Sequence, residues 1–437
     1  MINWRKPLIY FLFYLSGSYV PRDLRILRDL EKKDNNYLKK IQENRLKAVL
    51  LHAWKNVPYY KNILEEAEVV VDGAIKLENF KSIPFLTKDI IRKEKSNLYS
   101  IDHESRRSFK NTSGGSTGEP LLFMQDKEYW DMNGIAAKIY YFERLGKELG
   151  EPEVDVWGSE RDIFRNSLSL KERLINFLYN RTILNAFKFN DEKLDHFVEK
   201  INKIKPVAMW VYIESIEALA KHIKNNDLKI HSPKFIISTA GTLLPEARKL
   251  IQDVFHCPVY NQYGSREAGT LAIECEKQDG LHTFPFMHYL EVIDEEIVIT
   301  SLTNFSMPLI RYKIGDTAIK AKEDVCSCGK GFRLFGEITG RTASHFKTVK
   351  GNTVHSMVLI RQFWFQDWLK KFQLVQRRTD LIDCYVVKCS EVEEDRLRLL
   401  EDRIRFIMDG DCKVDFKFVE EIEPSPSGKN IFTICKI

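Results

Sequence analysis

One stretch of the chain alternates apolar helical faces with short, continuous apolar runs, and few folds accommodate this alternation. Apolar residues recur at helical spacing over 194–204 and again over 216–223. The runs 207–212 and 235–239 come after these helical segments. The first is wholly apolar and the second begins Phe-Ile-Ile, which is typical of strands buried on both faces. Because helix and strand alternate, we predict an α/β fold built on a mainly parallel sheet.

The pattern differs on either side of that stretch. Residues 1–105 are rich in helical patterns and loops, whereas 291–310 contains several short strand-like runs. Past residue 341, strand-like runs surround one amphipathic helix, which is typical of a small α+β unit. We therefore predict a large N-terminal domain over 1–340, with mainly parallel sheets flanked by helices plus a strand-rich subdomain, and a small mobile α+β domain over 341–437.

Composition restricts the class of protein. A chain of 437 residues with 44% hydrophobic and 30% charged residues is long enough for two or three domains with an ample core. The net charge of +5 is mild and no long Lys/Arg run occurs, so we expect no nucleic-acid partner. Eight cysteines in so long a chain are not a disulfide framework, and no cleavable signal pattern is present. These features predict a cytoplasmic location.

The run Leu8–Leu15 is wholly apolar and has basic residues on both flanks. A helix that spans a bilayer needs about 20 apolar residues, so this run is too short to cross one. Two interpretations remain. The run is either a terminal helix packed on the core or a weak contact with an anionic membrane surface, and the second leaves a membrane-peripheral location open.

Residues 111–120 (Asn-Thr-Ser-Gly-Gly-Ser-Thr-Gly-Glu-Pro) form a segment rich in glycines and hydroxyl groups. Glycines let successive backbone N–H groups point into one concavity, and such concavities bind anions. The segment lacks the Gly-Lys-Ser/Thr ending of a Walker loop, so an ordinary P-loop ATPase is disfavoured. A phosphate-binding loop and a plain flexible connection both remain open at this point.

Further polar clusters follow along the chain. Residues 240–242 follow the predicted strand at 235–239, and residues 264–267 follow a further strand-like run at 259–263. Ligands of parallel sheets bind at such strand ends. Three more clusters lie at 311–316, at 340–341 and at 424–429. Together with the glycine-rich loop, their order and spacing resemble the adenylate-forming (acyl-activating) enzyme superfamily, and in particular its phenylacetate–CoA ligase branch with the capsule-biosynthesis proteins of that branch. The segments Asn56–Tyr60 and Ile83–Lys88 are similar to N-terminal signatures of this branch.

The resemblance implies that a small carboxylic or amino acid attacks the α-phosphate of ATP, giving an acyl-adenylate and pyrophosphate. The acyl group would then pass to CoA, a carrier or a sugar amine, with capsule or exopolysaccharide biosynthesis as a setting. It further implies that the loop binds phosphates through the residues Thr112, Ser113, Gly114, Gly115, Ser116, Thr117 and Gly118. ATP and Mg²⁺ are the implied cofactors, and the resemblance leaves a homodimer open.

The same resemblance assigns roles to single residues. The implied catalytic residues are Glu267 as the Mg²⁺ ligand, Arg341 on the ribose or a phosphate, and Lys429 on the α-phosphate and the substrate carboxylate. The implied remainder of the cofactor site is an adenine wall and a ribose-binding carboxylate, made by Gly241, Thr242, Tyr263, Gly264 and Asp316. Each charged residue also has a structural interpretation, as a solvated turn residue, a strand-end cap or an ion-pair partner. A buried structural pair is the stronger interpretation for Arg311.

Three departures from the family pattern open a second hypothesis. Gly115 replaces a hydroxyl residue, Glu119 stands where many relatives have Lys, and Ala343-Ser344 replace an Asp pair that includes the domain hinge. An adenylating ligase is therefore weighed against a binding or scaffold protein that keeps the fold without the chemistry. A kinase or nucleotidyltransferase is the remote third hypothesis. The acid pocket is expected near Trp130, Tyr140, Trp210 and Tyr212, although these aromatics fit a core equally well.

A separate pattern predicts a metal centre. Cys275 and His282 are separated by six residues, and Cys326-Ser-Cys328 follows His282 after 43 more. Three thiolates and one imidazole form a closed, structural Zn²⁺ site. Buried free cysteines with a core histidine are the alternative interpretation. Proteins of the branch that the chain resembles have a Cys/His cluster at this place, which favours zinc within the subsite 275–328.

Overall fold

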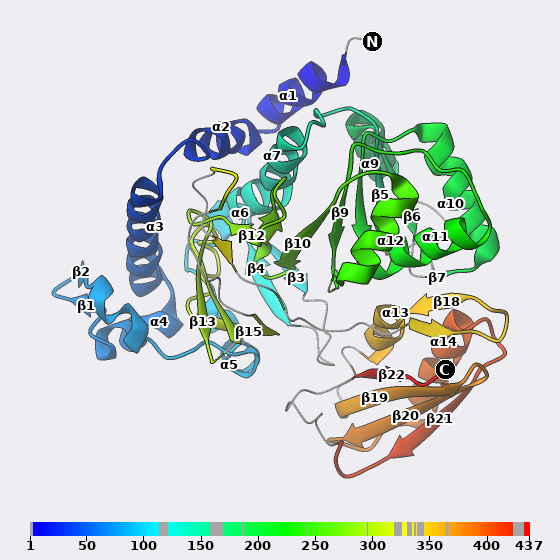
Figure 1. Ribbon diagram of the computed structural model, residues 1–437. Coiled ribbons are helices and arrows are strands. Elements are labelled where there is room, and N and C mark those ends of the chain that lie inside the picture. Colours follow the sequence, from blue (N-terminus) through cyan, green and yellow to red (C-terminus); the bar gives the residue numbers. More distant parts are fainter. Residues whose placement is uncertain are drawn as a thin grey trace.

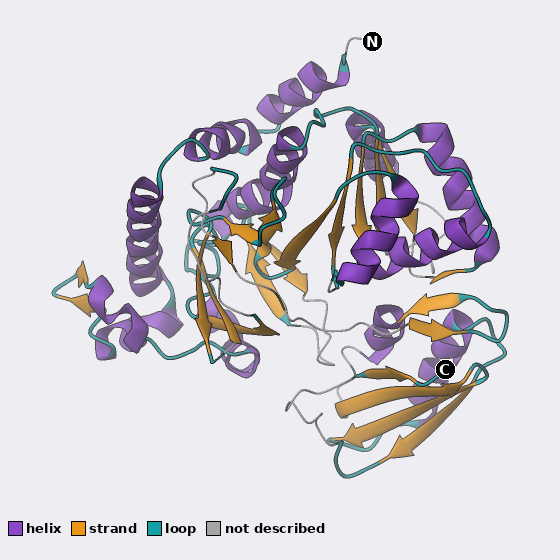
Figure 2. Cartoon of the chain, in the orientation of Figure 1, coloured by secondary structure: helices purple, strands orange, loops and turns teal. Residues whose placement is uncertain are grey.

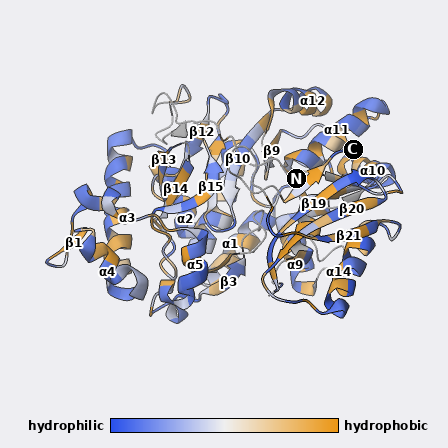
Figure 3. Cartoon of the chain, turned by 90° about the horizontal axis from the view of Figure 1, so that it is seen from below, coloured by the Kyte–Doolittle hydropathy of each residue, from blue (hydrophilic) through white to orange (hydrophobic). Residues whose placement is uncertain are grey.

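The computed structural model describes residues 3–437 except 113–120, 158–168, 186–187, 242, 295, 319–325, 330–333, 336–337, 339–344, 364–365, 367 and 423–431. The described residues form the predicted α/β structure, in which helices surround a central sheet (Figures 1 and 2). Most helices carry both hydrophilic and hydrophobic residues, as helices that cover a sheet do (Figure 3).

The central sheet is mainly parallel. Its eight strands lie in the spatial order β16 (Leu334–Phe335), β12 (Leu281–Thr283), β11 (Gly269–Glu274), β10 (Val259–Ser265), β9 (Phe235–Thr239), β8 (Ala208–Tyr212), β5 (Glu153–Trp157) and β6 (Arg181–Asn185). The strands from β10 to β6 pair in parallel, whereas β11, β12 and β16 continue the sheet antiparallel. The predicted strands at 207–212 and 235–239 are confirmed as β8 and β9.

Helices bury both faces of the parallel part, which explains the wholly apolar sequence of its central strand β8. On one face Ile236 of β9 packs in a core with the helices α10 (Asp191–Ile204), α11 (Ile213–Asn225) and α12 (Pro245–Phe255). On the other face Ile237 packs in a core with α7 (Ala137–Arg144). Tyr140 and Trp210 are buried in this second core, so they are core residues of the fold.

Four N-terminal helices follow one another along one side of the molecule (Figure 1). They are α1 (Arg5–Leu15), α2 (Val20–Leu30), α3 (Asn35–Asn56) and α4 (Pro58–Glu66). Pro58 separates α3 from α4 because a proline fits the first turn of a helix and not its interior. The short segments that follow are β1 (Val70–Val71), β2 (Ala74–Ile75), η1 (Leu77–Ser82), α5 (Lys88–Glu94), η2 (Lys95–Leu98) and η3 (Glu104–Arg106).

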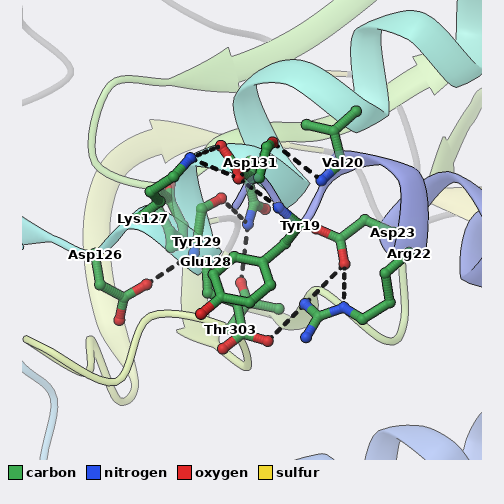
Figure 4. A network of polar contacts seen from close by, with 12 residues as sticks. Tyr19, Val20, Arg22, Asp23, Asp126, Lys127, Glu128, Tyr129, Asp131 and Thr303 are labelled. Carbon is green, nitrogen blue, oxygen red and sulfur yellow. Dashed lines mark hydrogen bonds and ion pairs between the residues drawn. The ribbon is translucent and has the colours of Figure 1, made fainter. Parts of the chain in front are cut away.

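A buried carboxylate fixes the connection between α1 and α2 (Figure 4). Oδ2 of Asp131 accepts hydrogen bonds of 2.8 Å from the Ser18 hydroxyl and the Tyr19 backbone N–H. Lys127, in the short helix α6 (Lys127–Trp130), lies 2.8 Å from the same oxygen and balances its charge. A π-helical segment, η4 (Asp131–Ala136), joins α6 to α7. The N-terminal helices are thereby anchored to the element that precedes the core helix α7.

Two smaller sheets form a strand-rich part of the molecule, and only the second of them covers the predicted segment 291–310. One pairs β3 (Phe109–Thr112) with β4 (Leu122–Gln125), and the other contains β13 (His288–Ile293), β14 (Glu296–Ser301) and β15 (Tyr312–Thr317). All their pairings are antiparallel. These strands pack in one core with α3 and α4, which places the strand-rich part between the N-terminal helices and the central sheet.

The C-terminal residues form a four-stranded sheet covered by one helix. The strands lie in the order β21 (Lys413–Phe418), β20 (Leu381–Lys388), β19 (Leu369–Arg378) and β22 (Thr433–Cys435), and the helix is α14 (Glu394–Ile407). Before them come β17 (His345–Lys347), β18 (Thr353–His355), α13 (Ser356–Ile360) and η5 (Arg361–Phe363). β18 also pairs with β7 (Lys188–Phe189), so one small sheet joins the C-terminal residues to the large part. The predicted boundary at residue 340 lies outside the described residues and stays a prediction.

Candidate nucleotide site and metal centre

The turn between β10 and β11 carries several of the predicted site residues. A Cβ atom on Gly264 would lie 2.5 Å from the backbone oxygen of Gly269, so only glycine allows the two strands to approach here. Gly269 itself has a φ of +67°, which favours glycine. The Ser265 hydroxyl accepts a 3.0 Å hydrogen bond from the Ala268 N–H and closes the turn. The sequence 264–269 therefore shapes a tight, fixed turn at the end of β10.

Glu267 is the one acid of this turn, and its side chain is buried. Its backbone oxygen accepts a 3.1 Å hydrogen bond from the hydroxyl of Tyr129, which holds the residue in place. Among the described residues, no hydrogen bond or ion pair engages its carboxylate. Because a buried carboxylate is costly without a compensating charge, this side chain suits a bound cation.

The glycine-rich loop begins beside the same turn. Arg266 donates a 3.2 Å hydrogen bond from Nη1 to the backbone oxygen of Thr112, and Gln125 donates one of 2.8 Å to the backbone oxygen of Arg266. These contacts bring together two segments that are 154 positions apart in the chain. The remaining predicted loop residues, 113–118, lie outside the described residues.

Tyr263 and Asp316 come together although they lie in different sheets. The Tyr263 hydroxyl donates a 3.0 Å hydrogen bond to Oδ2 of Asp316, which lies in β15. Both side chains are half-buried, so their outer faces remain accessible to a ligand. The predicted ring for adenine and the predicted carboxylate for ribose are therefore neighbours.

Gly241 lies at the carboxyl end of β9, beside a carboxylate that the motif analysis missed. A Cβ atom on Gly241 would lie 2.2 Å from Oε1 of Glu214, in the first turn of α11. Oε2 of Glu214 is buried and has no hydrogen-bond partner. Desolvation raises the pKa of this carboxyl to about 7. Glu214 comes shortly after the apolar run 207–212, and ligand sites of α/β proteins lie at strand ends. This position is the sequence signal that could have identified Glu214.

The other predicted residues have different outcomes. Thr242, Arg341 and Lys429 lie outside the described residues, so their roles stay predictions. Arg311 is a structural residue, which confirms the interpretation that it belongs to a buried structural pair. Its Nε lies 3.2 Å from a carboxylate oxygen of Glu291, and its guanidinium donates to two backbone oxygens of the segment 81–83.

The four predicted metal ligands form one cluster. The sulfur atoms of Cys275, Cys326 and Cys328 and a ring nitrogen of His282 all lie within 4.8 Å of one another. The Sγ atoms of Cys275 and Cys326 are 3.7 Å apart, and Sγ of Cys328 lies 3.5 Å from Nε2 of His282. Tetrahedral Zn²⁺, with Zn–S of about 2.3 Å and Zn–N of about 2.05 Å, requires separations of about 3.8 Å and about 3.6 Å. The donor set and its spacing therefore fit zinc.

The cluster lies at the antiparallel end of the central sheet. Cys275 directly follows β11, His282 lies in β12, and β12 pairs with β16 just after the two other cysteines. The cluster and the turn with Glu267 are thus at opposite ends of β11. A closed four-ligand site at this place joins three segments of the sheet and leaves no position for substrate.

Comparison with solved structures places this fold in a known class. The chain superposes on 2-hydroxyisobutyryl-CoA ligase, in complex with 2-HIB-AMP and CoA, with a TM-score of 0.62 and 18% identity over 94% of this chain and 92% of that one. The fold is that of the adenylate-forming ligases.

Sequence comparison shows which proteins of this class the chain is similar to. The chain is 26% identical to Protein CapK of Staphylococcus aureus over 93% of this chain and 91% of that protein. It is 23% identical to a phenylacetate-coenzyme A ligase of Thermus thermophilus over 81% of this chain and 82% of the ligase. Residues 346–436 match the family model of the CapK C-terminal domain. The chain is thus CapK-like and similar to the phenylacetate–CoA ligases, which confirms the resemblance predicted from its motifs.

Proposed function

We propose that this protein is an acyl-activating ligase, which adenylates a small carboxylic or amino acid with ATP and releases pyrophosphate. One observation carries the proposal: the buried carboxylate of Glu267, unpaired within the described residues, lies on the turn to which the start of the glycine-rich loop is hydrogen-bonded. A cation site next to a phosphate-binding loop is what nucleotide activation requires. The likeness to CoA ligases supports the same reaction.

In this proposal each group of site residues has its own binding role. The loop from Thr112 to Gly118 binds the phosphates through N–H and hydroxyl donors, and Tyr263 with Asp316 holds the adenosine. Glu267 binds Mg²⁺, which, when present, offsets the charge of the phosphate oxygens. Lys429, in the small domain, contacts the α-phosphate and the substrate carboxylate. Arg341, at the junction of the two predicted domains, contacts the ribose or a phosphate. The Cys275, His282, Cys326 and Cys328 cluster binds a structural Zn²⁺.

We further propose CoA as the acyl acceptor, because the similar ligases use it by name. A carrier arm and a sugar amine, with a role in capsule assembly, remain the alternatives to be tested. Binding of CoA, a carrier or a sugar amine can be compared directly by offering each acceptor to protein loaded with ATP and acid. Transfer to the sugar amine alone would favour the capsule setting.

Pyrophosphate exchange tests the proposed activation step. A panel of aryl, hydroxy and amino acids is screened for acid-dependent exchange of labelled pyrophosphate into ATP. We expect Lys429→Ala and Glu267→Gln to reduce exchange at least about a hundredfold, since each removes a charge that contacts the reacting phosphates. Lys436→Ala and Glu246→Gln, at exposed positions, are the matched controls and keep the rate. A wild-type protein that binds ATP without exchange across the panel favours the scaffold hypothesis, and release of ADP favours a kinase.

A further inference from the structure

The outward face of α1 is apolar and exposed. Ile9 and Phe13 point to the core and are buried, as expected for a terminal helix packed on the protein. The opposite face exposes four large side chains, whose exposed fractions run from 48% to 81%: Trp4, Phe11, Tyr14 and Leu15. Packing on the core therefore accounts for only one side of this helix.

A second helix extends the same face. In α9 (Leu170–Tyr179) the exposed apolar residues Leu170, Leu174 and Phe177 are spaced by four and three positions, so they share one side of the helix. The rings of Trp4 and Phe177 lie 6.3 Å apart. We call the seven exposed residues of the two helices the α1–α9 face.

One cation joins the two helices at this face. The Arg5 guanidinium lies 4.7 Å from the ring of Trp4 and 5.2 Å from the ring of Phe177. Its Nε also donates a 3.2 Å hydrogen bond to the backbone oxygen of Phe177. The connection after α1 is held by Asp131, so the face has a fixed orientation on the body of the protein (Figure 4).

The charges around the face are mainly positive. On α9, Lys171 and Arg173 flank the apolar stripe, and Glu172 between them is engaged in the capping box with Ser169. A hollow between α1 and α2 is lined by Tyr10, Pro21, Arg25, Arg28, Asp29 and Lys32, and of its three basic side chains Arg28 is ion-paired with Glu143. Within the part that the structure describes, neither Arg25 nor Lys32 forms an ion pair. An apolar surface with such a rim complements an anionic lipid surface.

A second copy of the chain fits this face less well. A two-fold interface brings the same patch of both copies together, so the basic rims would face each other and repel. Insertion across a bilayer is not supported either, because none of the helices among the described residues is long and apolar enough to span one. Shallow docking uses both the apolar face and the basic rim.

We propose that the α1–α9 face docks the protein onto anionic membrane surfaces, with the large apolar side chains inserted at the headgroup boundary and the basic side chains near lipid phosphates. The proposal is independent of the adenylation chemistry. It predicts that this protein works next to a lipid bilayer.

Vesicle flotation tests the docking. Full-length protein is mixed with phosphatidylcholine vesicles, with and without phosphatidylglycerol. We expect binding to the anionic vesicles, and a loss of more than about tenfold in the bound fraction for the double variant Phe11→Ser/Leu174→Ser, because burial of each such side chain in an apolar medium is worth about tenfold or more. Arg25→Glu/Lys32→Glu is expected to remove the preference for anionic lipid while weak binding to neutral vesicles persists.

The control uses the same residue types on another surface. Leu399→Ser/Phe406→Ser replaces two exposed apolar residues of α14 in the C-terminal part and is expected to bind vesicles as the wild type does. Thermal melts confirm that each variant is folded. Two flotation results would overturn the proposal: no flotation of the wild-type protein, or an equal loss of vesicle binding in the control variant. A third is light scattering that shows a dimer in protein that does not bind vesicles, if Phe11→Ser/Leu174→Ser dissociates that dimer.

Discussion

Replacing one metal ligand gives the sharpest test of the Cys/His cluster. The change is Cys328→Ser, because this thiol is the one ligand that is not fully buried, so the variant introduces no buried unsatisfied hydroxyl into the core. We expect wild-type protein purified without chelator to contain one Zn²⁺ per chain, and the variant to contain far less. X-ray absorption of the wild type should show three sulfur neighbours at about 2.3 Å and one nitrogen at about 2.0 Å.

The effect on stability follows from linkage. A ligand that binds only the folded state stabilises it by about 4 kcal/mol when its concentration is 1,000 times the dissociation constant. In a structure of this size, that amount corresponds to a fall of roughly 5–10 °C in melting temperature for Cys328→Ser. Adding a strong chelator to the wild type should give a fall of the same size, and the variant should no longer respond to chelator.

Cys389→Ser is the matched control, since Cys389 is an exposed cysteine in the C-terminal part and belongs to no ligand set. This variant should keep the metal and the melting temperature. The reasoning is refuted if wild-type protein carries no zinc, if its absorption spectrum requires oxygen ligands only, or if Cys389→Ser loses as much metal as Cys328→Ser. The measured separations of 3.7 Å and 3.5 Å would then reflect ordinary packing of thiols and a histidine.

Three further predictions concern residues around the proposed nucleotide site. Tyr263→Phe removes the hydrogen bond to Asp316, which is worth about 1.5 kcal/mol. We expect the KM for ATP in pyrophosphate exchange to rise about tenfold, while the melting temperature changes little. An unchanged KM would contradict the proposed ribose role of Asp316. Arg311→Met leaves the Glu291 carboxylate buried without its partner, so urea unfolding should show a loss of about 3–5 kcal/mol, whereas a neutral result would mean that the pair is not buried in solution. The pKa of Glu214 is raised to about 7, so its contribution to stability is complete below about pH 4.5 and is lost as the pH rises through 7. Glu214→Gln should therefore flatten the pH dependence of the melting temperature between pH 5 and 8, and an unaltered profile would argue against the burial.

The sequence predicted those parts of the fold that local pattern determines. Continuous apolar runs identify β8 and β9, because both faces of these strands are covered by helices. The ligand pattern of Cys275, His282 and Cys326 identifies the cluster, because metal geometry restricts which residues can meet. Arg311 was separable from the site residues because an arginine that directly follows an apolar run needs a buried partner.

Other features depend on long-range contacts that no local pattern contains. β7 is only two residues long, and it is a strand because β18 supplies its partner. The contact of Tyr263 with Asp316 joins two sheets whose relative position depends on packing between segments far apart in the chain. Glu214 was missed because it meets Gly241, a residue at the end of a different strand, and no local pattern contains this contact.

The position of the metal ligands along the chain sets an order for biosynthesis. Cys275 and Cys326 are 51 positions apart, so β10 and β11 leave the ribosome well before the second half of the ligand set exists. Until β16 emerges, the nascent sheet ends at an open edge at β12, and an open edge can pair with other chains. If the proposed zinc binds, its capture has to wait until residues 326–328 have been synthesised, and growth in zinc-depleted medium would then be expected to increase aggregation of this protein through that edge.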